Sequence, residues 1–415
     1  MTKRQAPDDE APFDIVLVGA TGYVGALIGE YMANTYGHNK VRWAMAGRNA
    51  AKLEAVKAAL GERGARVATI VADTSDAKAC EALAARTKVI LTTVGPYAKF
   101  GSALVAACAK AGTDYCDLAG ETPWIQNMID AHQDEAAATA ARIVPCCGFD
   151  SIPSDLGVLF LNDEVKKRTG QPCRAIRMRV KSMKGGASGG TIASMMNMVE
   201  EATRNKAMRQ MLGNPYALNP QGQRQGVRPP GSPPVAYDGD AKSWTAPFIM
   251  AAINTRVVQR SNAVMNYAYG RDFKYDEAIM TGGGVLGSPA ALAVSGAMGA
   301  FGLAAAFAPT RALLNRFVLP KPGEGPTPAQ RESGNFDLLF IGTAFDGRIF
   351  KARVTGDRDP GYGSTAKMIS EAAICLSETG RDEVGGGFWT PASAMGQRLI
   401  ARLVENAGLT FGMVE

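Results

Sequence analysis

The sequence predicts an α/β fold: a doubly wound parallel sheet over residues 13–150, then a second α+β domain with an antiparallel sheet. Three observations support this. An apolar strand at 13–18 runs into three glycines spaced three residues apart. Strands and helices then alternate up to residue 150. Beyond that point the strands alternate in polarity, and a hairpin turn at 345–348 joins two of them.

The glycine turn after the first strand is typical of a Rossmann dinucleotide-binding unit. One glycine permits the tight turn, one lets the backbone approach a pyrophosphate, and one lets the helix pack close to the strand. The spacing is G-x-x-G-x-x-G rather than G-x-G-x-x-G, and the alternative is a glycine-rich turn without a ligand. The predicted cofactor contacts in this turn are Gly19, Thr21, Gly22, Tyr23, Val24 and Gly25.

The second strand–helix unit indicates which dinucleotide binds. Its strand at 41–46 ends at Gly47-Arg48-Asn49, where an NAD site places an acidic residue on the ribose 2′-hydroxyl. No acidic residue stands there, and Arg48 offers a guanidinium for a 2′-phosphate. We therefore expect NADP(H). The alternative is a solvated arginine ahead of a helix at 50–60 that Asn49 caps.

The remaining units of this domain repeat the pattern. The predicted strands are 65–71, 88–94, 114–118 and 142–146, and the predicted helices are 77–85, 102–111 and 123–141. Ligands of such sheets bind at the carboxyl ends of the strands. Asp73, Thr93, Gly95 and Pro96 lie at those ends and complete the predicted cofactor site.

Composition excludes several classes of protein. The 415 residues carry a net charge of +6, and no basic run alternates with aromatic residues, which argues against a nucleic-acid partner. The 7 cysteines form no C-x-x-C pair, which argues against a metal site and for a reducing, cytoplasmic location. With only 2 histidines, histidine-dependent catalysis is not expected. Residues 1–12 are polar and predict a disordered tail, not a signal peptide.

The second half of the chain has a different pattern. We expect residues 151–360 to form a substrate or dimerisation domain and residues 361–415 to form helices that pack back on the body. A strand at 174–180 alternates in polarity, and residues 214–240 are rich in Pro, Gly and Gln and predict a long loop. Residues 365–378 predict an amphipathic helix.

An apolar segment interrupts this domain. Residues 278–310 include no charged residue, and the stretch 285–308 is long enough to span ~30 Å of hydrocarbon. It is rich in Ala and Gly, and Pro289 and Pro309 bracket a helix. A buried or interface helix, the wall of an apolar substrate channel, a membrane-surface helix and a spanning helix remain open.

Taken together, the motifs resemble the saccharopine dehydrogenase-like oxidoreductases, and within them the trans-acting enoyl reductases of mycobacterial lipid synthesis. The matching stretches are 14–25, 46–48, 94–97, 112–121, 147–155, 188–191, 319–326 and 359–362. The resemblance implies an NADP-dependent oxidoreductase, plausibly one that reduces the C=C of an enoyl thioester or a related lipid-like substrate. It also implies a homodimer and, as in some relatives, association with the inner face of the membrane.

Enoyl reduction needs a donor that stabilises the enolate oxygen and a proton for Cα. The candidate catalytic residues at the strand ends are Tyr97, Tyr115 and Lys99, and water is the alternative proton source. Tyr97 could equally be a packed tyrosine that follows a proline-terminated strand.

Candidate substrate contacts are Asp150, Ser151, Ser188 and Thr191. For Ser151, capping of the following helix is the simpler interpretation. The glycines around Ser188 predict an anion-binding nest or a flap that closes the site.

Two other functions stay open. A saccharopine-type amino-acid dehydrogenase would need arginines for the carboxylates of its substrate. One predicted strand carries Arg174, Arg177 and Arg179, whose face could also simply be solvated. A catalytically silent NADP-binding protein at the membrane would bind the cofactor without turnover.

Overall fold

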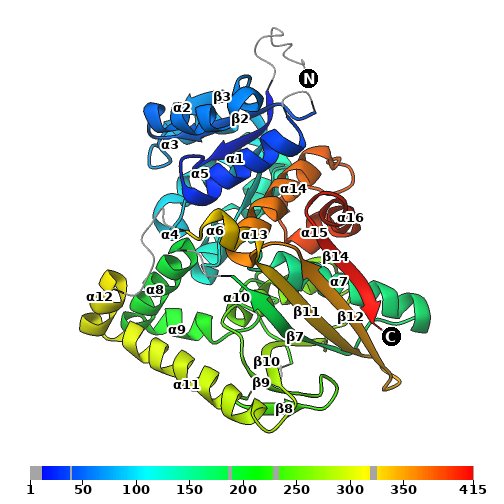
Figure 1. The fold of residues 1–415 in the computed structure, drawn as a ribbon. Helices are drawn as coiled ribbons and strands as arrows, with labels where there is room; N and C mark the ends of the chain where they lie inside the picture. The colour runs from blue at the N-terminus through cyan, green and yellow to red at the C-terminus, as the bar shows by residue number, and fades with distance from the viewer. Residues whose placement is uncertain (1–11, 38–39, 186–188, 228–232, 318–324, 415) are drawn as a thin grey trace.

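The computed structural model describes residues 12–37, 40–185, 189–227, 233–317 and 325–414. These residues form two seven-stranded sheets, A and B, which lie one above the other in Figure 1. The N-terminal tail predicted at 1–12 lies almost wholly outside the described residues.

Sheet A is parallel throughout and has the strand order β13-β6-β5-β4-β1-β2-β3. Its strands are β1 (Phe13–Val18), β2 (Trp43–Gly47), β3 (Ala68–Val71), β4 (Thr87–Thr92), β5 (Asp114–Asp117), β6 (Arg142–Val144) and β13 (Gly387–Phe388). Because β1 pairs with both β2 and β4, the strand order reverses at β1. The doubly wound parallel sheet is therefore confirmed.

Helices cover both faces of sheet A (Figure 1). They are α1 (Tyr23–Thr35), α2 (Ala50–Ala59), α3 (Ala77–Ala84), α4 (Tyr97–Phe100), α5 (Ser102–Ala111) and α6 (Thr122–Thr139). As predicted, the Asn49 side chain caps α2 by accepting from Lys52 N at 2.9 Å. The predicted helix 365–378 is α14 (Thr365–Glu378), which packs against α1, β4 and β5.

Sheet B has the order β14-β12-β11-β7-β10-β9-β8. Its strands are β7 (Ala175–Lys184), β8 (Ala236–Asp238), β9 (Ser243–Pro247), β10 (Lys274–Gly282), β11 (Asn335–Thr343), β12 (Ile349–Gly356) and β14 (Leu409–Val414). Every pair is antiparallel except β7 with β10, so the sheet is mixed and not purely antiparallel as predicted. The long crossover between β7 and β10 makes this parallel pair possible.

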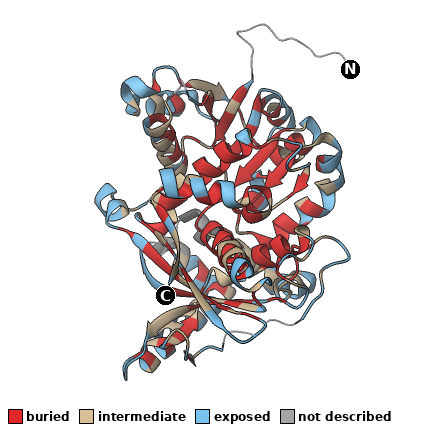
Figure 2. Cartoon of the chain, turned by 90° about the vertical axis from the view of Figure 1, so that its right-hand side faces the viewer, coloured by how far each residue is buried: buried red, intermediate tan, exposed pale blue. Residues whose placement is uncertain are grey.

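Further helices pack around sheet B. They are α7 (Ile152–Thr169), α8 (Gly189–Arg204), α9 (Lys206–Leu212), α10 (Ala251–Val264), α11 (Gly287–Ala306), α12 (Ala308–Phe317), α13 (Pro328–Glu332), α15 (Pro391–Ala394) and α16 (Gly396–Asn406). Figure 2 shows buried residues concentrated in sheet A, its helices and the junction of the two sheets.

The predicted apolar segment forms α11, which touches β9, β10 and α8 but is largely exposed. Only 11% of its most apolar window is buried, so a buried core helix is wrong. Sequence could not settle this, because a run of Ala, Gly and Leu suits both environments. Among the described residues, α11 alone is long and apolar enough to cross a membrane.

Candidate active site

The carboxyl edge of sheet A gathers most of the predicted cofactor residues. Gly19 follows β1, Arg48 follows β2, and Thr93 follows β4. The turns after β1 and β4 flank the point where the strand order reverses, which is where open α/β sheets bind their ligands.

The glycine turn has the shape that the motif predicts. Gly19 has a φ of +90°, and a Cβ there would lie 2.8 Å from both Thr93 Oγ1 and Val94 Cγ2. At Gly25, a Cβ would lie 2.2 Å from the Gly19 carbonyl oxygen. In the described part of the chain no side chain caps α1 at Gly22. Its first backbone N–H groups can therefore receive a pyrophosphate.

Arg48 stands exposed after β2 and makes no ion pair with a described residue. Asp73 lies near it and accepts hydrogen bonds from Ser75 N at 2.9 Å and Ser75 Oγ at 2.8 Å. These bonds, with a smaller contribution from Arg48, lower the pKa of Asp73. The Arg48 guanidinium is thus available for a 2′-phosphate.

The loop after β4 is held by a buried carboxylate, which the sequence places at the end of a strand without assigning it a role. Glu121, 2% exposed, accepts from Tyr97 N at 2.7 Å and Ala98 N at 2.9 Å. It also accepts from Ser194 Oγ of α8 at 2.7 Å. Glu121 therefore ties α8 to the loop that carries Gly95 and Pro96.

The two candidate tyrosines are both buried and hydrogen-bonded within the domain. Tyr97 Oη donates to the Thr92 carbonyl at 3.2 Å and accepts from Leu118 N at 3.0 Å. Tyr115 Oη donates to Asp117 Oδ2 at 2.9 Å. Burial raises the pKa of both hydroxyls well above its ordinary value. Their positions do not support proton transfer to a substrate.

Lys99 differs from the tyrosines because it is exposed on α4. No described residue forms a hydrogen bond or an ion pair with its ammonium group, which is free to meet an oxyanion. A catalytic role for Lys99 stays a prediction.

Asp150 and Ser151 follow β6 at the same edge of the sheet. Asp150 is half-buried and has no hydrogen-bond partner among the described residues, and burial raises the pKa of its carboxyl to about 6. The prediction that the Ser151 side chain caps α7 is wrong, because its Oγ donates to Asn254 Oδ1 at 3.1 Å. Of the other candidates, Ser188 lies outside the described residues. Thr191 lies on α8, and its side chain is not described.

Asn254 belongs to a buried polar network that sequence reasoning missed. Its Nδ2 donates to Ser154 Oγ at 3.1 Å and to Glu277 Oε2 at 3.0 Å. Tyr275 Oη donates to Glu277 Oε1 at 2.8 Å, and burial raises the pKa of Glu277 to about 7. This network joins α7, α10 and β10. No local motif marks it, because its members come from distant segments.

Arg177 and Arg179 are already paired within the domain. Arg177 contacts Asp238 at 3.0 Å. Arg179 contacts Asp238 at 2.8 Å and Asp276 at 2.6 Å. These guanidinium groups are therefore not free to hold the carboxylates of a substrate.

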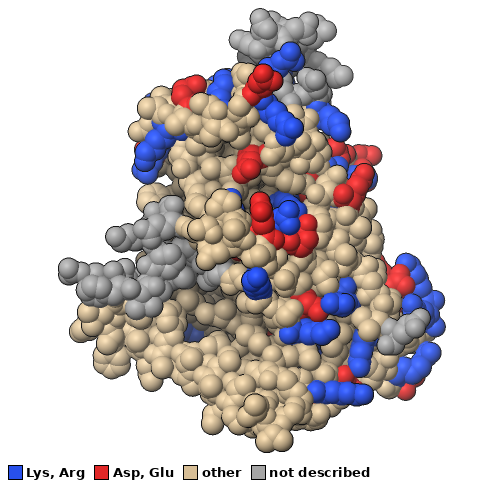
Figure 3. All heavy atoms as spheres, viewed as in Figure 1, with Lys and Arg blue, Asp and Glu red and all other residues tan. Residues whose placement is uncertain are grey.

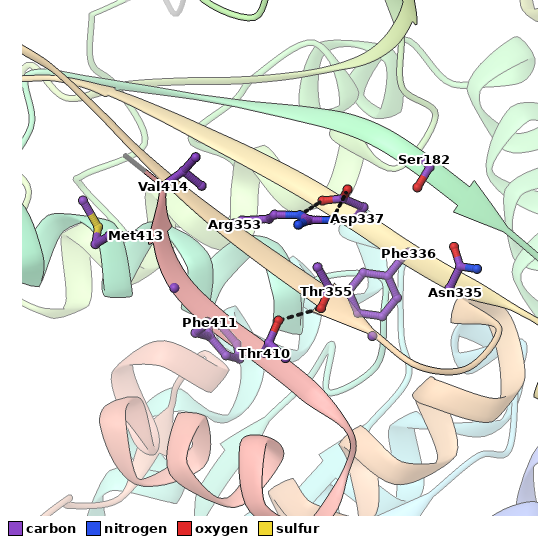
Figure 4. A pocket seen from close by; sticks show the side chains of 12 residues that line it. Ser182, Asn335, Phe336, Asp337, Arg353, Thr355, Thr410, Phe411, Met413 and Val414 are labelled. Atoms are coloured by element: carbon purple, nitrogen blue, oxygen red, sulfur yellow. Dashed lines mark hydrogen bonds and ion pairs between the residues drawn. The ribbon is translucent and has the colours of Figure 1, made fainter.

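Two hollows lie away from the glycine turn. One, of about 800 Å³, lies on the open face of sheet B beside Arg353 and Asp337, which pair at 2.6 Å (Figure 4). The other, of about 320 Å³, is an almost wholly apolar groove between α8 and α9, lined by residues that include Met195, Met198 and Leu212.

Comparisons with known proteins agree with this geometry. The sequence profile of the saccharopine dehydrogenase NADP binding domain matches residues 15–144. A Mycobacterium tuberculosis protein provisionally named a trans-acting enoyl reductase is 42% identical over 94% of this chain and 95% of its own length. A trans-acting enoyl reductase of Mycobacterium bovis is 39% identical over 97% of this chain and 98% of its own. The chain belongs to the saccharopine dehydrogenase-like oxidoreductases.

A solved structure supports the shared fold. Saccharopine dehydrogenase (L-Glu forming) from Saccharomyces cerevisiae matches with a TM-score of 0.53 at 12% identity, covering 97% of this chain and 100% of that chain. As a member of the saccharopine dehydrogenase-like family with an NADP-binding domain, the chain is an NADP-dependent oxidoreductase. The free amide groups at α1 and the exposed Arg48 fit NADP(H).

Proposed function

We propose that this oxidoreductase reduces the C=C of an enoyl thioester that carries a lipid-like acyl chain. The observation that carries the proposal is the apolar groove on α8. Met195 and Met198 line it, and Ser194 on the same helix binds Glu121 beside the loop after β4. An acyl chain in this groove would direct its thioester end toward that loop. The names of the relatives support the same reaction.

The apolar groove on α8 and the pairing of the strand arginines with aspartates disfavour the saccharopine-type alternative. An amino-acid substrate with several carboxylates needs a cluster of unpaired arginines. Of the three predicted arginines, Arg177 and Arg179 are paired with aspartates, and only Arg174, exposed just before β7, is left. A multiply charged substrate would also lose its hydration in an apolar groove without compensation.

The proposed roles follow from the strand ends. When bound, NADPH supplies a hydride. The turn at 19–25 would hold the pyrophosphate, Arg48 would hold the 2′-phosphate, and the loop at 93–96 would lie near the nicotinamide. The Asp150 carboxyl, with its pKa raised to about 6, is partly protonated near neutral pH and gives a proton to the substrate Cα. The Lys99 ammonium stabilises the enolate oxygen.

The test is NADPH consumption with paired substrates. Long-chain and short-chain trans-2-enoyl thioesters are compared with an amino acid plus a 2-oxo acid. We expect turnover with the thioesters only, and Met198→Glu should lower kcat/KM for the long chain more than for the short chain. The matched control, Val404→Glu on exposed α16, should change neither. Turnover with the amino acid pair alone would overturn the proposal, and binding without any turnover would favour the silent protein.

We further propose that α11 rests on a membrane surface. Leu292, Leu303 and Phe307 are each about two-thirds exposed, at 66%, 68% and 66%. Figure 3 shows a broad area without Lys, Arg, Asp or Glu over this part of the molecule. Sedimentation with phospholipid vesicles tests this: the native chain should pellet, and Leu303→Glu should stay in solution. A native chain that never pellets would contradict it.

We also propose a homodimer that forms through the open face of sheet B. Thr410 and Val414 lie on this face near the Arg353–Asp337 pair (Figure 4), a mixture of uncharged and paired charged groups that suits an interface. Phe411 and Met413 turn to the other face of β14, where they pack on the core. Light scattering after gel filtration should give twice the chain mass, and Val414→Glu, at a side chain 39% exposed on this face, should halve it. A native monomer would contradict the proposal.

A further inference from the structure

We infer that Arg331, which lies outside the nucleotide-binding domain, is a further cofactor-binding residue and contacts the pyrophosphate of NADP(H). The argument starts at Tyr23, the first residue of α1. Its backbone lies where the glycine turn meets the helix, so a pyrophosphate bound there lies next to this residue.

Tyr23 reaches across to the second domain. Its hydroxyl donates to the Pro326 carbonyl and accepts from Arg331 Nη1. The guanidinium carbon of Arg331 lies 5.6 Å from the centroid of the Tyr23 ring, within cation–π range. Arg331 Nη1 also donates to the Pro326 carbonyl at 3.1 Å. The guanidinium is therefore fixed beside the start of α1.

Two further contacts hold the Tyr23 ring. The Tyr362 ring meets it edge-on, with centroids 5.0 Å apart and an interplanar angle of 78°. A Cβ on Gly325 would lie 2.5 Å from the ring, so only a glycine backbone fits there. The Tyr23 ring and its hydroxyl are thus held by several contacts, and Tyr23 in turn positions Arg331.

The charges around Arg331 favour an anion. Arg331 is half-buried and forms no ion pair with a described residue, but its charge partly offsets the burial that raises the pKa of Asp359. The nearby Asp359 carboxylate accepts from Gly361 N at 3.1 Å and Gly363 N at 2.7 Å. The guanidinium, which has no ion pair with a described residue, is therefore anchored to the first residue of α1, the helix end where the dipole is positive. A pyrophosphate between them would compensate both charges.

In this arrangement two arginines bind different phosphate groups of the cofactor. Arg48 would bind the 2′-phosphate from the nucleotide-binding domain, and Arg331 would bind the pyrophosphate from the segment that follows the apolar helices. Binding of the whole cofactor would then draw on both parts of the chain, whereas a fragment without the pyrophosphate would not need Arg331.

Calorimetric titration of the full chain with NADPH and with adenosine 2′-phosphate, which lacks the pyrophosphate, tests the assignment. We expect Arg331→Gln to weaken NADPH binding about tenfold or more and to leave adenosine 2′-phosphate binding unchanged. Arg48→Gln should weaken both. Arg331→Lys, which keeps the charge, should recover part of the loss. No acyl substrate is present, so the outcome is independent of the proposed enoyl reduction.

Two results would overturn the assignment. One is an Arg331→Gln variant that binds NADPH as the native chain does. The other is an equal loss of affinity for NADPH and adenosine 2′-phosphate, which would indicate a general structural role. Tyr23→Phe serves as the matched control: it removes the hydroxyl contact but keeps the guanidinium over the ring, so its effect on NADPH affinity should be smaller than that of Arg331→Gln.

Discussion

The layer between the two sheets buries carboxyl groups, whereas α11 exposes leucines and a phenylalanine. In the first region, Asp155 is fully buried but accepts from Ser261 Oγ at 2.5 Å and Ala392 N at 2.8 Å. In the second, Leu303 is 68% exposed on a helix without a charged residue.

The difference shows what each region requires. A buried polar group is tolerated when hydrogen bonds compensate its lost hydration, and the layer around Asp155, Asn254 and Glu277 provides them. An exposed apolar face has no such compensation within the described residues. We therefore interpret this layer of buried polar groups as the structural joint between the two sheets. We interpret α11 as the exposed apolar surface for which we propose contact with a membrane.

The largest expected effect comes from breaking the joint. Asp155→Ala removes a buried acceptor: Ala392 N loses its partner, Ser261 Oγ keeps only its bonds to Val257 and Thr390, and a cavity is left, so we expect a loss of about 3 kcal/mol in the free energy of unfolding. Urea denaturation measures it. The control Asp155→Asn keeps one acceptor and should lose less; equal losses in both variants would contradict this account of the joint.

A second effect of similar size is a pH dependence of stability. The pKa of Glu277 is raised from 4.5 to about 7 in the folded chain. Below pH 4.5 the carboxyl is protonated in both states, and its contribution is fully present. As the pH rises toward 7, the unfolded chain ionises first, so about 3 kcal/mol of stability is lost across this window.

Urea midpoints measured between pH 4.5 and 8 test this expectation. Glu277→Gln cannot ionise, so the urea midpoint of this variant should fall less steeply with pH than that of the native chain. The pKa of Asp155 is also raised, to about 7, so a residual slope in the same direction should remain. An unchanged slope in Glu277→Gln would show that this carboxyl does not titrate as described.

The smallest expected effect on stability is at α11. Leu303→Ser removes an exposed apolar side chain, so the free energy of unfolding should change by only about 0.5 kcal/mol or less. The same variant should bind less of a hydrophobic dye or vesicle. A loss of several kcal/mol would mean that α11 is part of the core and would remove the contrast between the two regions.

The sequence was sufficient where structure is encoded locally. The strand at 13–18, the Gly19–Gly25 turn, the Asn49 cap and the helix at 365–378 were all predicted, because periodicity and special backbone positions are visible in neighbouring residues. The parallel β7–β10 pair was not, because it depends on segments far apart along the chain.

Side-chain roles at the site show the same limit. Tyr97 and Tyr115 were predicted as catalytic groups, but the Tyr97 hydroxyl bonds to backbone at the ends of β4 and β5, and the Tyr115 hydroxyl bonds to Asp117 of its own strand. Arg331 and Tyr23 are 308 positions apart in the sequence, and no motif near either residue indicates that they are in contact. Exposure of α11 likewise depends on what packs on it, which composition does not specify.

The most direct test of the central claim is the fate of the hydride. NADPH deuterated at the transferred position is incubated with a long-chain trans-2-enoyl thioester, and the product is analysed by mass spectrometry and NMR. The account predicts a saturated thioester with one deuterium on Cβ and a solvent proton on Cα. Recovery of unchanged thioester, together with deuterium in an amino-acid product when an amino acid and a 2-oxo acid are supplied, would contradict it.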